Sequence, residues 1–350
     1  MLFWFIFILI VFFCLGEFNL NGRWNRPLMQ GLGIFIITIV SALRFDVGFD
    51  YPSYYKTIVL DNFDFDFEIL SGYVFSIGRN IGYPPLSFII ITVLISSFVF
   101  STLCKYSTNI FVATMVYVCF FYLNSLNTIR QSLAISITFW GVRYIFQKSF
   151  FRYFLVCIFA SLFHSSALLA CVIYPFYRFI STRYIPVILI LIAIGYKTIL
   201  ETFLTIGYYD RVSNGLLIIS EENMTEGGGM YVRIAMLLVI VCLYLLTWLK
   251  KVEVDRNLLS LCSIGCIFPF LIGTHMGMRI AEYFLIYLCL VIPQVLCAYK
   301  SYFRALCVII FICYFLLLIT TGRNQKRAPF LPYQTIFNID NIKDPVFRQP

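Results

Sequence analysis

The chain has 350 residues, of which 61% are hydrophobic and only 12% are charged, and its mean hydropathy is +0.89. A soluble domain carries about 25% charged residues, so this chain has too few charges to cover itself with a polar surface. The composition excludes an ordinary soluble enzyme, a disordered chain and a secreted disulfide scaffold, and it predicts a polytopic membrane protein. The net charge of +9 does not indicate nucleic acid, because the basic residues lie between hydrophobic segments and do not form a patch on a soluble face.

Apolar segments that can cross a bilayer follow one another along the chain, since a spanning helix needs about 20 mostly apolar residues. The first of them lacks a basic start and a small-residue cleavage site, so we interpret it as an anchor and not as a signal peptide. The candidate spans are Leu2–Gly16, Leu28–Leu43, Leu86–Cys104, Ile110–Leu123, Thr128–Phe146, Tyr184–Phe203, Met230–Leu249, Asn257–Gly273, Arg279–Leu296 and Arg304–Thr321.

The segment Tyr153–Tyr177 contains no Asp, Glu, Lys or Arg, and His164 divides it into two halves. Cytoplasmic loops carry an excess of Lys and Arg. The basic clusters of this chain can all face the cytoplasm only if Tyr153–Tyr177 crosses twice, as a broken helix pair that meets near His164 on the outer side. Those clusters are Arg23/Arg26, Lys105, Arg143/Lys148/Arg152, Arg178/Arg183, Lys250/Lys251/Arg256 and Lys300/Arg304.

This assignment predicts an all-α polytopic integral membrane protein with about 12 short crossings and both termini outside. Residues 1–321 form a single transmembrane domain, and residues 322–350 form an outer, periplasmic tail. Loop 44–85 is long and lies outside, and within it Phe67–Ile81 is helical but too polar to span, so we expect an interfacial helix.

Ionisable side chains at membrane depth are functional candidates by default, because they are costly there unless they are paired or hydrated. On the predicted topology they gather toward the outer leaflet. Simpler interpretations exist: an Arg at a helix end can merely snorkel to the headgroups, aspartates can line a solvated loop, and a His can pack in the core. Lys197 and Glu201 suit an internal ion pair. The candidates are Arg44, Asp46, Asp50, Arg130, Gln131, His164, Arg279 and Glu282.

Such residues suit recognition of an anionic headgroup at the outer interface. Arg forks bind phosphate through charge-assisted hydrogen bonds, and a carboxylate or imidazole could accept a proton from a sugar hydroxyl. Tyr51 and Tyr54, with Tyr55, could stack on sugar rings. The sequence has no Gly-rich phosphate loop and no metal-ligand motif, and its 12 cysteines lie in apolar runs. We therefore expect packing thiols, no cofactor and no catalytic metal.

Four segments resemble motifs of one known family. Arg44-Phe-Asp-Val-Gly-Phe-Asp-Tyr51, followed by Tyr54, is similar to the R-x-D-x-G-x-D-Y-x-x-Y signature of EpsG-type membrane proteins. The other three segments are Asn127-Thr-Ile-Arg-Gln-Ser-Leu-Ala134, Ala160-Ser-Leu-Phe-His-Ser-Ser-Ala167 and Arg279-Ile-Ala-Glu-Tyr-Phe284. They occur in the family's order, and Pro332-Tyr333 adds a weak similarity.

The EpsG family includes exopolysaccharide and O-antigen polymerases of the Wzy type. The resemblance implies a glycosyltransferase that joins undecaprenyl-diphosphate-linked oligosaccharides at the outer face of the bacterial inner membrane. Membrane lipids and a chain-length regulator would be its other partners. We expect Arg130 and Arg279 to hold the diphosphate, Arg44, Gln131 and Glu282 to bind substrate, and Asp46, Asp50 or His164 to be the base.

Two other functions stay open at this point. A membrane acyltransferase that decorates surface glycans could use His164 as its base, but it would need an acyl donor from the cytoplasm, where the loops hold little besides scattered basic residues. A transporter of lipid-linked sugar predicts a polar path through the whole bilayer, whereas the unusual residues gather at one face. The sequence does not indicate which sugars are joined or the linkage formed.

Overall fold

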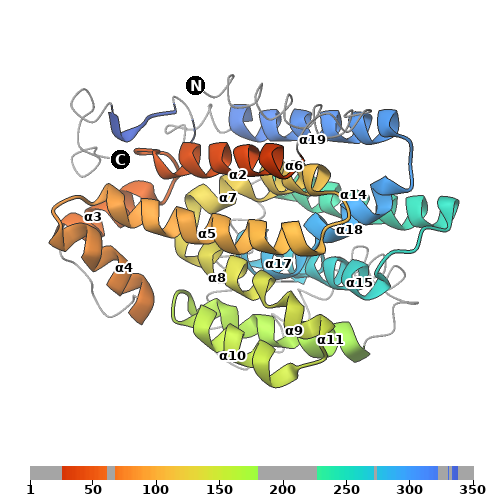
Figure 1. Ribbon diagram of the computed structural model, residues 1–350, viewed down its shortest axis with the longest axis horizontal. Coiled ribbons are helices and arrows are strands. Elements are labelled where there is room, and N and C mark those ends of the chain that lie inside the picture. Colours follow the sequence, from red (N-terminus) through yellow and green to blue (C-terminus); the bar gives the residue numbers. More distant parts are fainter. Residues whose placement is uncertain are drawn as a thin grey trace. The chain divides into compact units, whose positions relative to one another are not determined.

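The computed structural model describes residues 26–60, 68–179, 227–271, 274–321, 330 and 333–337. Throughout these residues the chain is helical, and the one β-type contact is an isolated antiparallel bridge between Arg44 and Thr335 (Figure 1). The chain divides into two compact units, residues 1–168 with 299–350 and residues 169–298. Every cysteine that the structure describes is a free thiol.

The first unit is organised around α5 (Pro85–Tyr106), a helix of 22 residues that begins with Pro85 at its N-terminus. It packs against α2 (Arg26–Ala42), α4 (Ile69–Asn80) and α8 (Ile129–Trp140). Figure 1 shows α3 (Tyr51–Leu60) and α4 at one end of α5. The helix α4 lies within the predicted interfacial segment Phe67–Ile81, whereas the sequence analysis contained no helix over Tyr51–Leu60.

Two predicted spans of this unit are each divided into two helices. Ile110–Leu123 corresponds to α6 (Ile110–Phe120), which Asn109 caps through its side chain, and to the start of α7 (Tyr122–Asn127). Thr128–Phe146 corresponds to α8 and α9 (Val142–Phe146), separated at Gly141. A Cβ at Gly141 would lie 2.9 Å from the Thr138 carbonyl oxygen, so the close approach requires glycine. The last helix, α19 (Ser301–Thr321), packs against α6.

The predicted break at His164 is present. Helix α10 (Phe150–Ser161) ends three residues before His164, and the chain resumes as a 3₁₀-helix, η1 (Ser165–Val172), which continues into α11 (Ile173–Phe179). A helix end leaves backbone groups without intrahelical partners. The break therefore creates polar backbone positions within an otherwise apolar stretch.

The second unit contains α11, α14 (Gly227–Lys250), α15 (Arg256–Gly265), α16 (Phe268–Leu271), α17 (Thr274–Leu285) and α18 (Leu288–Cys297). Asp255 caps α15 by accepting from the backbone N–H groups of Asn257 and Leu258, and it also accepts the Tyr177 hydroxyl at 2.8 Å. The predicted span Arg279–Leu296 is a bent pair, since Met276–Leu285 and Leu288–Cys297 meet at 51°.

Three helices in the described ranges are long and apolar enough to cross a membrane, and a fourth span results if the bent pair counts as one. They are Pro85–Tyr106, Arg233–Lys250 and Ser301–Ile319. The protein is thus a helical membrane protein, while the count of about 12 crossings stays a prediction. The predicted spans Leu2–Gly16 and Tyr184–Phe203, the pair Lys197/Glu201 and most of the predicted tail 322–350 lie outside the described residues.

Candidate functional site

The loop between α2 and α3 is fastened to the end of α7. The backbone N–H of Asp50 donates to Asn127 Oδ1 at 3.1 Å. Gly48 has φ of +110°, and a Cβ there would lie 2.7 Å from the Leu126 carbonyl oxygen. Only glycine fits a positive φ together with so close a backbone approach. Two of the four segments that resemble family motifs, 44–51 and 127–134, therefore contact each other.

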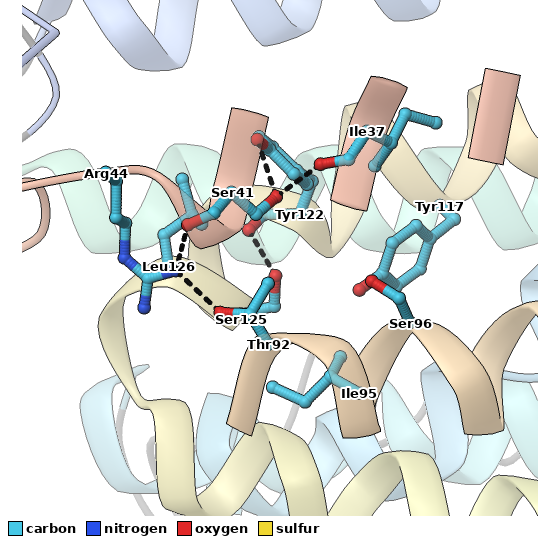
Figure 2. A pocket seen from close by; sticks show the side chains of 10 residues that line it. All are labelled: Ile37, Ser41, Arg44, Thr92, Ile95, Ser96, Tyr117, Tyr122, Ser125 and Leu126. Atoms are coloured by element: carbon cyan, nitrogen blue, oxygen red, sulfur yellow. Dashed lines mark hydrogen bonds between the residues drawn. The ribbon is translucent and has the colours of Figure 1, made fainter. Parts of the chain in front are cut away.

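Arg44 points from this loop into the core of the first unit. Its side chain is buried, and Nη1 donates to the Ser41 carbonyl oxygen at 2.9 Å and to Thr92 Oγ1 at 3.1 Å (Figure 2). Nε and Nη2 have no hydrogen-bond partner among the described residues. The pKa of Arg44 is lowered, because burial outweighs the opposite effect of the nearby Tyr333, Tyr51 and Tyr122. In the part of the chain that the structure describes, the Arg44 guanidinium is thus surrounded by hydroxyl groups and aromatic rings, and not by carboxylates.

A small polar cavity lies beside Arg44. Its volume, measured as the space open to the centre of a water molecule, is about 10 Å³, so it has room for about one water. Its polar lining consists of side chains from α2, α5, α6 and α7, which are labelled in Figure 2: Ser41, Thr92, Ser96, Tyr117, Tyr122 and Ser125. Such a space is too small for a sugar or a diphosphate.

A short stretch of the C-terminal region covers the same loop. The backbone N–H of Phe45 donates to the Gln334 carbonyl oxygen at 2.9 Å, and that of Ile336 donates to the Leu43 carbonyl oxygen at 3.0 Å. The Tyr333 hydroxyl bonds to the carbonyl of Val40. The weak sequence similarity at Pro332-Tyr333 thus includes a residue that anchors the loop of the first motif.

A second polar cluster joins Arg130 on α8, Glu68 before α4 and His164 at the helix break. Arg130 Nη1 lies 2.6 Å from Glu68 Oε2, and His164 Nδ1 lies 2.9 Å from Glu68 Oε1. The backbone N–H of Ser165 donates to the same Oε1 at 2.8 Å. The Arg130 and His164 side chains are 18% and 23% exposed, so this cluster, unlike that of Arg44, is open to its surroundings.

The helix break explains why Glu68 reaches His164. The carbonyl groups left open at the end of α10 are used by the start of α4: the backbone N–H of Leu70 donates to Leu162 at 3.0 Å, and Ser71 Oγ donates to Phe163 at 2.7 Å. These two bonds hold the first turn of α4 against the break, which brings the preceding residue, Glu68, beside His164 and Ser165.

The Glu68 carboxylate is ionised under ordinary conditions. Burial raises its pKa, but hydrogen bonds from His164 and from the Ser165 N–H, together with the charge of Arg130, outweigh burial and lower the pKa of Glu68 from 4.5 to about 2. Hydrogen bonds to the charged form of a carboxyl favour that form. The carboxylate therefore acts only as an acceptor near neutral pH.

The predicted tyrosines lie in different surroundings. Tyr54 places its ring 5.5 Å from the guanidinium carbon of Arg130, within the range of a cation–π contact. Tyr51 is buried and stacks on Phe88 with ring centroids 4.1 Å apart. Tyr54 thus belongs to the Arg130 cluster, and Tyr51 belongs to the packed core behind the loop.

The remaining predicted residues are positioned as follows. Asp46 is half-buried and has φ of +50°, and Asp50 is half-buried at the start of α3. Gln131 is buried on α8. Arg279 and Glu282 lie three residues apart on α17 in the second unit, where Glu282 is buried and Arg279 is half-buried.

Glu68 is the residue that the sequence analysis missed. It follows Asp61, Asp64 and Asp66 in the predicted outer loop 44–85, where a run of acidic residues suits a solvated loop. A usable signal was present, because Glu68 is the one acidic residue within the predicted interfacial helix Phe67–Ile81. In the part of the chain that the structure describes, no three His, Cys, Asp or Glu side chains gather to hold a metal ion.

The long apolar helices make this a helical membrane protein, and its first unit contains two polar clusters, one around Arg44 and one around Arg130. Its family follows from the sequence: the model of the EpsG family matches residues 31–335, and the chain belongs to that family. Membership of the EpsG family indicates a role in polysaccharide biosynthesis, similar to that of a polysaccharide polymerase. No curated protein and no solved structure matches the chain.

Proposed function

We propose that the protein is a polysaccharide polymerase that transfers a growing glycan from its undecaprenyl diphosphate onto a new lipid-linked repeat unit. The reaction takes place at the outer face of the inner membrane, without a metal ion. Polymerisation of this kind needs a site that binds a diphosphate, a base for the acceptor hydroxyl and an opening toward the membrane interface.

One arrangement carries this proposal. Three segments far apart in the sequence meet in the first unit, since the loop 44–51 contacts Asn127 and the following helix α8 brings Arg130 to Glu68 and His164. An arginine and an imidazole thus flank one carboxylate at a helix break, and the Tyr54 ring lies against the arginine. The guanidinium suits the diphosphate and the imidazole suits the sugar hydroxyl.

The roles follow from the chemistry of each group. Arg130 neutralises the charge that develops on the departing lipid diphosphate, and this is the largest expected contribution to the rate. Arg279 of the second unit stays a predicted substrate-binding residue. His164 accepts the proton of the acceptor hydroxyl. Asp46 and Asp50 orient the acceptor sugar, and Tyr54 stacks on it. Arg44 and Tyr51 support the loop from the core side.

Incubation of the purified protein with synthetic lipid-diphosphate repeat units tests the proposal. A ladder of products that differ by one repeat is expected, with and without EDTA, and none from Arg130→Ala protein. Product that stays at one repeat unit with the wild type contradicts a polymerase. A ladder that disappears with EDTA and returns with a divalent ion contradicts the metal-free mechanism.

Glycan chains in a deletion strain separate the alternatives in cells. A polymerase predicts single repeats on the surface after deletion. Long chains without a modification would instead indicate an acyltransferase, and the absence of surface repeats would indicate a transporter of lipid-linked sugar.

A further inference from the structure

The carboxylate of Glu68 contacts the imidazole that the proposed function treats as the base. We propose that Glu68 is a positioning residue: it fixes the proton of neutral His164 on Nδ1 and so presents Nε2 to the acceptor hydroxyl. This inference rests on the proposed function, and it adds a residue that none of the four resembling segments contains.

The first step concerns the direction of the hydrogen bond. His164 Nδ1 and Glu68 Oε1 are 2.9 Å apart, and an ionised carboxylate has no proton to donate. The proton of this bond must therefore reside on Nδ1. Because a neutral imidazole carries one N–H, its Nε2 is then left with a lone pair and can act as a base.

The second step concerns the orientation of the carboxylate itself. Its two oxygens have different partners, since Oε1 accepts from His164 and from the Ser165 N–H, while Oε2 lies 2.6 Å from Arg130 Nη1. Rotation about the carboxyl bond would exchange these partners. Three donors, one on α8 and two at the helix break, thus hold the Glu68 carboxylate in one orientation. The hydrogen bond from Nδ1 to this fixed carboxylate then fixes the plane of the His164 imidazole.

The third step is the reaction that this geometry permits. His164 Nε2 takes the proton of the acceptor hydroxyl while its oxygen forms a bond to the anomeric carbon of the donor glycan. The bond between that carbon and the diphosphate oxygen breaks, and the electron pair leaves with the lipid diphosphate. The imidazolium, stabilised by the Glu68 carboxylate, then returns its proton to water.

The position of the imidazole proton can be measured without turnover. The chain contains two histidines, so protein labelled with ¹⁵N-histidine in nanodiscs gives two sets of ring signals at most, and the set missing from His164→Asn protein belongs to His164. We expect the Nδ1–H form in the wild type. In Glu68→Leu protein Nδ1 loses its acceptor, so nothing favours the Nδ1–H form and the Nε2–H form should appear. An Nε2–H form in the wild type, or the same form in both proteins, overturns the proposal.

Kinetics provide the second readout. Glu68→Gln should lower kcat by about 10²–10⁴-fold, the usual contribution of a general base, while KM for the lipid-linked acceptor changes by less than about threefold. Ser71→Ala is the matched control, because Ser71 fastens the same helix turn to the same break at 2.7 Å through Phe163 and not through His164.

The outcomes are distinguishable. Ser71→Ala should retain most of the wild-type kcat, and Glu68→Asp should recover some of the rate lost in Glu68→Gln. An equal loss of kcat in Ser71→Ala and Glu68→Gln would mean that Glu68 only docks α4, and the proposal would be wrong. A wild type that makes no ladder refutes the proposed function instead, whichever form the NMR signals report.

Discussion

Two arginines of the first unit, both singled out by the sequence, have opposite surroundings. Arg44 is buried, contacts a backbone carbonyl and a threonine hydroxyl, and lies among tyrosines. Arg130 lies partly exposed beside an ionised carboxylate and an imidazole. A motif residue of this protein can therefore serve the site in two ways, by holding its loop in place or by contacting the substrate.

Exposure and counter-charge decide between these roles. A buried guanidinium cannot meet a diphosphate without opening the core, and the cavity beside Arg44 has room for about one water. Arg130 is paired with Glu68 and is still 18% exposed. Substitutions at the two positions should therefore affect different properties of the protein.

Substitution of Arg130 should abolish polymerisation while the protein remains in the membrane. Removal of one donor aimed at developing charge typically lowers the rate by about 10²–10³-fold, and lysine loses the planar fork. We therefore expect single-repeat glycan from both Arg130→Ala and Arg130→Lys cells, measured by gel analysis of surface glycan. Full-length polymer from Arg130→Lys at normal protein level would show that Arg130 only anchors its helix.

Substitution of Arg44 should reduce stability more than catalysis. Arg44→Ala loses two hydrogen bonds to a charged group, each worth about 1.5–3 kcal/mol, but it also relieves the burial of that charge. We expect a net loss of about 1–3 kcal/mol, seen as a lower unfolding temperature in detergent. Arg79→Ala, at an exposed arginine of α4, should change stability by less than about 0.5 kcal/mol.

The rate per folded molecule separates the two roles of Arg44. It should stay within about tenfold of wild type in Arg44→Ala protein, because the side chain supports the loop from behind. A variant as stable as wild type that makes no polymer would place Arg44 in contact with substrate and remove the contrast with Arg130.

Two glycines provide a matched pair for the loop. Gly48→Ala puts a side chain at φ of +110° and 2.7 Å from a backbone oxygen, which should destabilise the protein by about 1–3 kcal/mol. Gly72→Ala in α4 meets no atom within 4 Å and should stabilise by about 0.5–1 kcal/mol. Thermal unfolding of both variants measures this, and equal stability of the two would contradict the close approach of the loop to Leu126.

The acid side of the stability profile tests the ion pair of Glu68. A carboxyl whose pKa is lower in the folded protein stabilises the fold above its unfolded pKa, and that stabilisation is lost as the pH falls through the folded value. For Glu68 the window extends from pH 4.5 down to about 2. The unfolding temperature of Glu68→Gln should therefore fall less than that of wild type across this window, by the equivalent of about 1 kcal/mol.

A surface variant serves as the control for this effect. Glu253→Gln removes an exposed carboxylate and should follow the wild-type profile. Parallel profiles for Glu68→Gln and wild type would contradict the assignment of a strongly held carboxylate at the helix break.

The sequence predicts much of this architecture for identifiable reasons. The apolar runs predict α5, α14 and α19 because a long helix that is apolar all round has few other uses. The interruption at His164 is visible because a charge-free run is divided by one polar residue. The subdivision of other spans is harder to see, since the close packing that requires Gly141 depends on Thr138 and Tyr153, and the latter belongs to another helix.

The site is predictable only where a motif marks it. Arg130 and His164 are found from their segments, but their shared contact with Glu68 depends on how α4 docks at the break. That docking involves backbone groups of Leu162 and Phe163. Backbone acceptors leave no trace in side-chain identity. The four motifs therefore do not distinguish Glu68 from the neighbouring acidic residues of loop 44–85. The sequence predicts Arg44 as a substrate-binding residue, whereas the Arg44 side chain points into the core.

A double-mutant cycle of Glu68→Gln and His164→Asn, measured as the rate of repeat-unit transfer, tests whether Glu68 acts through the imidazole of His164. Residues that act as one unit give a double variant no slower than the slower single variant. We predict that the double variant matches His164→Asn within about threefold. Losses that multiply, so that the double variant is slower by the product of the two single effects, would contradict a carboxylate that acts through the imidazole.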